Sequence, residues 1–155
     1  MTAPASSIYI DGMRKLLPIV LVLFASSAFG ESIADLRKKA AAGDAEAQTK
    51  LGVRYANGRG VRKNYKEAVK WYRKAAEQGN AEAQNNLGLM YRKGRGVPKD
   101  YVAAYAWHSV DKSNFMGEHS RAKIAKEMTP EQIAKAKELP KELLKEIEAN
   151  KAKKK

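Results

Sequence analysis

Small and apolar side chains recur along the middle of the chain at the spacing of an α-helix. In residues 43–78, Ala47, Leu51 and Tyr55 follow one another at intervals of four positions. Residues three and four positions apart lie on the same face of an α-helix, so these side chains form one apolar stripe. Because the same spacing returns in residues 79–114, the pattern predicts two pairs of helices in an all-α fold.

The two segments are copies of one unit with a period of 36 residues. They are identical at sixteen of their thirty-six positions, whereas chance matching would give roughly two. The recurring positions, which we expect to form the structural frame and its core, are Ala45, Ala47, Leu51, Gly52, Tyr55, Gly58, Gly60, Ala68 and Trp71, and then Ala81, Ala83, Leu87, Gly88, Tyr91, Gly94, Gly96, Ala104 and Trp107. A single hairpin cannot bury its apolar face alone, so we expect the copies to stack.

Glycine and capping residues predict where the helices end and begin. Gly58 and Gly94 follow the first helix of each copy, where a left-handed backbone conformation favours glycine. Asn64 suits the N-cap of the second helix. Gly52 and Gly88 lie inside the first helix, where glycine costs about 1 kcal/mol relative to alanine. We therefore expect another helix to pack closely against them.

Incomplete copies flank the two full repeats. Residues 32–42 match the second helix of a copy that lacks its first, and residues 115–140 form an atypical C-terminal cap. The terminal repeats of a solenoid are expected to differ from internal ones because one of their faces meets solvent. The predicted repeat domain thus covers residues 31–140.

The C-terminal region predicts a final helix with a break. Thr129 and Pro130 suit its first positions as N-cap and first helical residue. Pro140 has no backbone N–H, so we expect it to interrupt this helix. The lysine-rich residues 141–155 are then expected to form a short further helix that frays from Lys151 onward.

The N-terminal residues have the order of a secretory signal peptide, in which basic residues precede an apolar run and a small-residue cleavage site. The basic pair follows Met13, the apolar run covers residues 16–24, and small residues lead to Gly30. We expect residues 13–30 to be a signal peptide cleaved after Gly30, and residues 1–12 to be a non-native extension. The apolar run is shorter than the roughly 20 residues that cross a membrane, although a retained anchor stays an alternative. The expected location is periplasmic or secreted.

Residues for catalysis or metal binding do not occur in the patterns that these functions need. The chain has no cysteine, which excludes disulfides and thiolate zinc sites. Its two histidines, His108 and His119, lack the four-residue spacing of a helical metal site, and the sequence has no nucleophile-elbow motif. We expect no enzyme activity, no cofactor and no metal.

The motif of the repeat spans both predicted helices. It reads Ala45-x-Ala47-x-x-x-Leu51-Gly52-x-x-Tyr55-x-x-Gly58-x-Gly60-Val61 and then Tyr65-x-x-Ala68-x-x-Trp71-Tyr72. In this motif the chain resembles the Sel1-like repeat family, a relative of the tetratricopeptide repeat. The second copy departs after Trp107, where His108 replaces the tyrosine. The resemblance implies a right-handed α/α superhelix that serves as a protein-binding scaffold, and that function rests on analogy of fold.

By this resemblance, the first helix of each hairpin lines a concave groove. A stripe beside its core face differs between the copies at four of five positions, while the neighbouring core positions do not differ. This variation fits a binding site on a repeated frame, and drift at exposed positions predicts the same. The candidate contacts are Glu46, Thr49, Val53, Ala56 and Asn57 in the first copy and Glu82, Asn85, Leu89, Arg92 and Lys93 in the second. We expect a protein or peptide partner of unknown identity and a monomeric chain.

The net charge of +13 suggests a second function. Loss of residues 1–30 removes two basic residues and one acidic residue, so +12 would remain. The cations gather in the first repeat as Arg59, Arg62, Lys63, Lys66, Lys70, Arg73 and Lys74. The alternative function is therefore attachment to an anionic envelope surface of lipid headgroups or polysaccharide. A merely solvated surface stays open, and nucleic acid is not expected as the target of an exported protein.

Overall fold

The structure is a computed structural model, and it describes residues 31–110 and 115–153. The predicted N-terminal extension and signal peptide lie outside these residues. The described helices belong to one unit, Ile33–Lys155. They are α2 (Ile33–Ala41), α3 (Ala45–Asn57), α4 (Tyr65–Ala76), α5 (Ala81–Lys93), α6 (Tyr101–Val110), α7 (Phe115–Ala125) and α8 (Pro130–Ala152).

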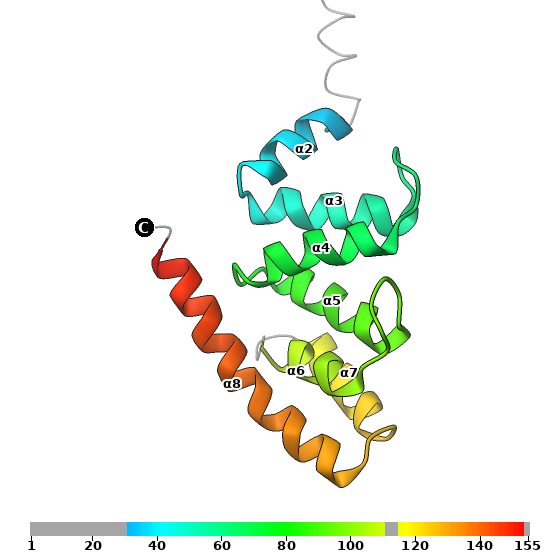
Figure 1. The fold of residues 1–155 in the computed structure, drawn as a ribbon, viewed down its shortest axis with the longest axis vertical. Helices are drawn as coiled ribbons and strands as arrows, with labels where there is room; N and C mark the ends of the chain where they lie inside the picture. The colour runs from blue at the N-terminus through cyan, green and yellow to red at the C-terminus, as the bar shows by residue number, and fades with distance from the viewer. Residues whose placement is uncertain (1–30, 111–114, 154–155) are drawn as a thin grey trace, which may run out of the picture. The chain divides into compact units, whose positions relative to one another are not determined.

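These helices stack as antiparallel pairs (Figure 1). The first full hairpin is α3 with α4, the second is α5 with α6, and α4 packs on α5 to join them. At one end α2 packs on α3, and at the other end both α7 and α8 pack on α6. The predicted all-α stack of two hairpins between incomplete copies is confirmed. In the described residues all regular structure is helical.

The helix ends lie where local chemistry favours them. The side chains of Asp44 and Asn80 cap α3 and α5 by accepting hydrogen bonds from backbone N–H groups at 2.7 and 2.9 Å. Asn64 caps α4 in the same way at 3.1 Å, as predicted. Gly58 and Gly94 end α3 and α5 in the left-handed conformation, with φ of 72° and 62°.

The core has one leucine or isoleucine at the same position of each first helix. Leu51 and Leu87 are fully buried and Ile124 in α7 is 1% exposed. The main cluster joins side chains of α3, α4, α5, α6 and α8, and a smaller cluster joins α2 to α3. The predicted core is confirmed at Trp107, which is 6% exposed. Trp71, also expected in the core, is only half-buried. It packs on the smaller cluster that joins α2 to α3.

The glycines inside the first helices permit close packing, as predicted. A Cβ atom at Gly52 would lie 2.6 Å from Cε1 of Tyr72 on the paired helix. A Cβ atom at Gly88 would lie 2.8 Å from Nε2 of His108. Real Cβ atoms do not approach other atoms so closely, so each glycine provides the space that the opposite ring occupies.

The expected break at Pro140 is wrong, because α8 continues through it. An internal proline loses one helical hydrogen bond and costs about 3 kcal/mol. Ala136, Pro140 and Ile147 are buried on one side of α8, and Leu143 packs on the main cluster. Burial of this apolar face against the stack therefore outweighs the local penalty.

The expected fraying from Lys151 stays a prediction, because the described residues end at Lys153. The helix α8 includes Lys151 and ends at Ala152. The Nζ atom of Lys151 would lie 2.6 Å from a Cβ atom at Gly79, in the turn between α4 and α5, and Ile147 contacts the same turn. The last turns of α8 thus lie against the turn between α4 and α5.

Candidate functional site

Buried glutamines link successive hairpins. The side chain of Gln48 in α3 donates a hydrogen bond of 3.0 Å to the carbonyl of Ala40 in α2. One repeat later, Gln84 in α5 donates a bond of 3.1 Å to the carbonyl of Ala76 in α4. Both glutamines are nearly inaccessible, at 4% and 3% exposure. They satisfy carbonyls at the end of the preceding helix and so fix the position of one hairpin on the next.

Arginine–tyrosine pairs form a second link between the same helices. Arg37 of α2 donates a hydrogen bond of 3.2 Å to the hydroxyl of Tyr55 in α3. Arg73 of α4 donates to the hydroxyl of Tyr91 in α5 in the same way. Both tyrosines are therefore half-buried, with their hydroxyls at the surface, and not the fully buried core residues that the spacing predicted. These arginines and tyrosines each recur after 36 residues, and this recurrence is the sequence feature that could have predicted the links.

Two predicted partner contacts are wrong, because the structure buries them. Thr49 is 1% exposed and its hydroxyl donates to the carbonyl of Ala45 in the preceding turn. Ala56 is 8% exposed and belongs to the main core cluster. Asn85 and Arg92 occupy the equivalent positions of α5 and are half-buried. Because Thr49 and Ala56 face inward, the exposed stripe of α3 lies about one residue further around the helix than the sequence pattern indicated.

The exposed stripe of each first helix follows a spacing of four, three and four residues. In α3 it contains the exposed pair Glu46 and Lys50, whose charged groups lie 2.7 Å apart. Val53 follows, half-buried against the core, and Asn57 is exposed. We call these residues and their α5 equivalents the α3–α5 stripe; its α5 members are Glu82, Asn86, Leu89 and Lys93. Sequence reasoning missed Lys50 and Asn86.

The side chain of His108 is buried inside the second hairpin. It is 2% exposed, and among the described residues neither ring nitrogen has a hydrogen-bond partner. Burial lowers the pKa of His108 to about 4, and the positive charges of Arg92 and Arg121 add to this effect. Arg121 of α7 also donates a hydrogen bond of 2.7 Å to the carbonyl of His108.

Residues that bind metals do not gather in the described part of the chain. It holds no cluster of three or more histidine and carboxylate side chains placed to bind an ion. His119 is exposed on α7, away from the buried position of His108. Nor does any helix in this part have the length and apolar character needed to cross a lipid bilayer.

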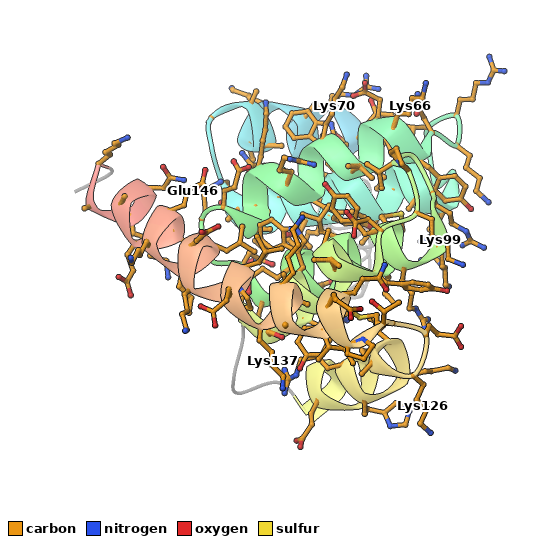
Figure 2. The ribbon with its side chains drawn as sticks, turned by 60° about the horizontal axis from the view of Figure 1, so that its bottom comes forward. Lys66, Lys70, Lys99, Lys126, Lys137 and Glu146 are labelled. Atoms are coloured by element: carbon orange, nitrogen blue, oxygen red, sulfur yellow. The ribbon has the colours of Figure 1, made fainter. Side chains whose placement is uncertain are left out.

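The basic residues of the first repeat form an exposed surface on and beside α4. Figure 2 shows Lys66 and Lys70 next to each other on α4, on the opposite side of the fold from Lys126 and Lys137. We define the α4 basic surface as Arg62, Lys63, Lys66, Lys70, Arg73 and Lys74, all of which are exposed. Hollows of about 680 and 610 Å³ adjoin it.

Comparisons with known proteins identify the repeat. The Sel1 repeat family matches residues 45–80 and 81–109. A protective antigen present in uropathogenic Escherichia coli strains, whose crystal structure displays an SLR fold, is 38% identical with a TM-score of 0.71, covering 74% of this chain and 25% of that chain. A Sel1 repeat protein from Oxalobacter formigenes is 35% identical with a TM-score of 0.57, covering 67% of this chain and 44% of that chain.

The likeness therefore concerns part of each longer protein, since this chain spans a quarter of the first and less than half of the second. No protein of curated function matches the chain. Sel1 repeats typically mediate protein–protein interactions, and proteins built from them are generally non-catalytic scaffolds. Together, the two matched repeats and the shared helical solenoid show that the chain contains two Sel1 repeats in an SLR-type fold.

Proposed function

We propose that the chain is a non-enzymatic adaptor of the bacterial cell envelope that binds a partner protein through the α3–α5 stripe. The observation that carries the proposal is that three of the four stripe positions differ between the repeats, whereas the buried frame is constant. The buried leucines and linking glutamines recur in both repeats, whereas Lys50 is replaced by Asn86 and Asn57 by Lys93. The envelope location rests on the signal-peptide pattern of residues 13–30.

The stripe has the chemistry of a surface that binds protein. Val53 and Leu89 keep part of their apolar surface accessible at the same position of α3 and α5. Charged and amide side chains lie one helical turn away on either side of them. Apolar anchors surrounded by polar groups suit a partner helix or an extended peptide, because the anchors supply affinity and the rim supplies specificity.

Site-specific photo-crosslinking in the native cell tests this surface. A photoreactive amino acid at Lys50 or at Asn86 should crosslink the same partner, since both positions lie on the stripe. The same amino acid at Lys137, an exposed residue of α8, is the matched control. Leu89→Asp should abolish the crosslink, and it is preferred to Val53→Asp because Val53 also packs on the core.

The thermal unfolding curve of Leu89→Asp shows whether the variant is folded, so loss of the crosslink is not mistaken for loss of structure. Equal crosslinking from Lys50, Asn86 and Lys137 would contradict the proposed surface. So would an unchanged crosslink in folded Leu89→Asp. Mass spectrometry of the protein from the periplasm or medium tests the location, with Glu31 expected as the first residue.

A further inference from the structure

Two hollows lie on either side of α4, and they are the same feature of the repeat. The first, of about 610 Å³, lies beside Arg37 and the turn that contains Gly60. The second, of about 680 Å³, lies beside Arg73 and Gly96, the equivalent residues one repeat later. Glu67 of α4 lines both hollows, so a ligand that follows the stack can occupy both at once.

The walls of these hollows carry a large excess of positive charge. Two carboxylates line them, Glu67 and Glu77, and Glu67 already forms an ion pair of 2.6 Å with Lys70. The exposed cations are Arg37, Arg62, Lys63, Lys66, Lys70, Arg73 and Lys74. Arg37 and Arg73 hydrogen-bond to neutral tyrosine hydroxyls, and Arg73 also lies within the electrostatic range of Glu77.

The same hollows also contain apolar side chains. Ile33 and Val61 line the first hollow, and Val69 and Trp71 line the second. Trp71 is half-buried, and the ammonium group of Lys74 lies 4.8 Å from the centre of its ring. Each hollow is thus lined by cations, which we call its walls, and by two apolar side chains, which we call its floor.

We propose that the two hollows bind an acidic segment of another protein in which carboxylate side chains alternate with apolar ones. Carboxylates complement the cations of the walls, and apolar side chains fill the floor. A flat lipid surface meets the exposed cations but does not reach the floor. A polysaccharide carries no apolar side chains to fill it. None of the residues that line the two hollows belongs to the α3–α5 stripe, so the two sites are distinct.

Fluorescence anisotropy with a short labelled peptide of glutamate and leucine residues tests the site. We expect the chain that begins at Glu31 to bind this peptide and to lose affinity as salt is added, because salt screens exposed charges. Lys66→Glu/Lys74→Glu should weaken binding about tenfold or more. Lys126→Glu/Lys137→Glu makes the same change in net charge on the other side of the fold and should bind as wild type does (Figure 2).

Two further probes test the contribution of the apolar floor to binding separately from that of the cationic walls. A peptide with serine in place of leucine should bind more weakly, because it leaves the floor empty. In a Trp107→Phe variant Trp71 is the one tryptophan of the chain, and its emission should change when the glutamate–leucine peptide binds. Emission that stays constant while the peptide binds would place the peptide elsewhere and overturn the proposal.

Three other results would overturn it. The first is equal loss of affinity in the two charge-reversal variants, and the second is equal affinity for the leucine and serine peptides. The third is binding of anionic vesicles or sulfated polysaccharide through Lys66 and Lys74 without binding of the peptide. Leu89→Asp should leave peptide binding unchanged, so failure at the α3–α5 stripe and failure at the hollows are distinguishable.

Discussion

At the scale of the residue, His108 occupies in the second hairpin the position that Tyr72 occupies in the first. Both rings lie against a glycine of the paired helix, at Gly88 and Gly52. The imidazole is smaller than the phenol ring, and neither of its nitrogens finds a hydrogen-bond partner in the described residues. The packing arrangement is retained, while a buried titratable group is introduced.

A methyl group at Gly88 is expected to destabilise the fold by about 1 to 3 kcal/mol, because overpacking exceeds the gain in helix propensity. Urea unfolding of Gly88→Ala measures this. Gly88→Ala/His108→Ala completes a double-mutant cycle, since removal of the imidazole gives the methyl group room. Strictly additive effects of the two substitutions would show that they do not compete for space.

Stability should fall as the pH falls from about 6.5 to about 4. The folded state depresses the pKa of His108 to about 4, whereas the unfolded chain binds the proton near 6.5. The unfolded state therefore takes up the proton first, and the free energy of unfolding decreases by at most about 3 kcal/mol. Urea unfolding at several pH values measures the loss.

His108→Tyr is the matched control, because Tyr72 occupies the same position in the first hairpin. It should remove most of the decrease in stability between pH 6.5 and 4. An identical pH profile in this variant would show that other groups cause the decrease. Burial and the nearby charge of Glu146 raise the pKa of Glu77, while the charge of Arg73 opposes this effect, and both proteins retain this carboxyl group.

At the scale of the element, α8 shows how far packing overrides local preference. A continuous helix of 23 residues contains a proline that should interrupt it. The buried face of Ala136, Pro140 and Ile147 holds the two halves in line. The helix α8 forms in this position because its neighbours stabilise it, and not because its own sequence favours an uninterrupted helix.

Replacing Pro140 with alanine is expected to stabilise the protein by about 1 to 3 kcal/mol. Alanine restores a backbone donor inside the helix and removes a residue of very low helix propensity. Thermal and urea unfolding of Pro140→Ala measure the change, and Lys141→Ala, at the adjacent exposed position, is the control. A loss of stability would mean that contacts of the buried proline ring outweigh the restored hydrogen bond.

At the scale of the whole molecule, α8 closes the stack in a way that the repeated hairpins do not. It packs on α6, and Ile147 near its end contacts the turn between α4 and α5. Leu143, Leu144 and Ile147 join the main core cluster, which also contains side chains of α3, α4 and α5. A single terminal helix therefore contributes to the core of both hairpins.

A chain that ends at Thr129 should lose cooperative unfolding and bind a dye that detects exposed apolar surface. Its core would be uncovered where Leu143, Leu144 and Ile147 pack. A chain that ends at Ala152 removes only the terminal lysines and is the control. Calorimetry and dye fluorescence compare the two, and wild-type behaviour of the shorter chain would contradict this account of α8.

Much of the fold is determined by the sequence alone. The helices of the two hairpins, their turns at Gly58 and Gly94 and the close packing at Gly52 and Gly88 all follow from spacing and local backbone chemistry. These features depend on residues close together in the chain. The repeat strengthens these predictions, because each feature occurs twice at the same period.

The tertiary structure alone decided which side of each helix meets solvent. Thr49 and Lys50 are neighbours in the sequence, yet one is buried and the other lies on the exposed stripe. The helical path through Pro140 and the hollows beside α4 likewise depend on helices that are distant in the chain. Helical periodicity shows that a helix has an apolar side, but only its packing against neighbouring helices determines how far around the helix burial extends.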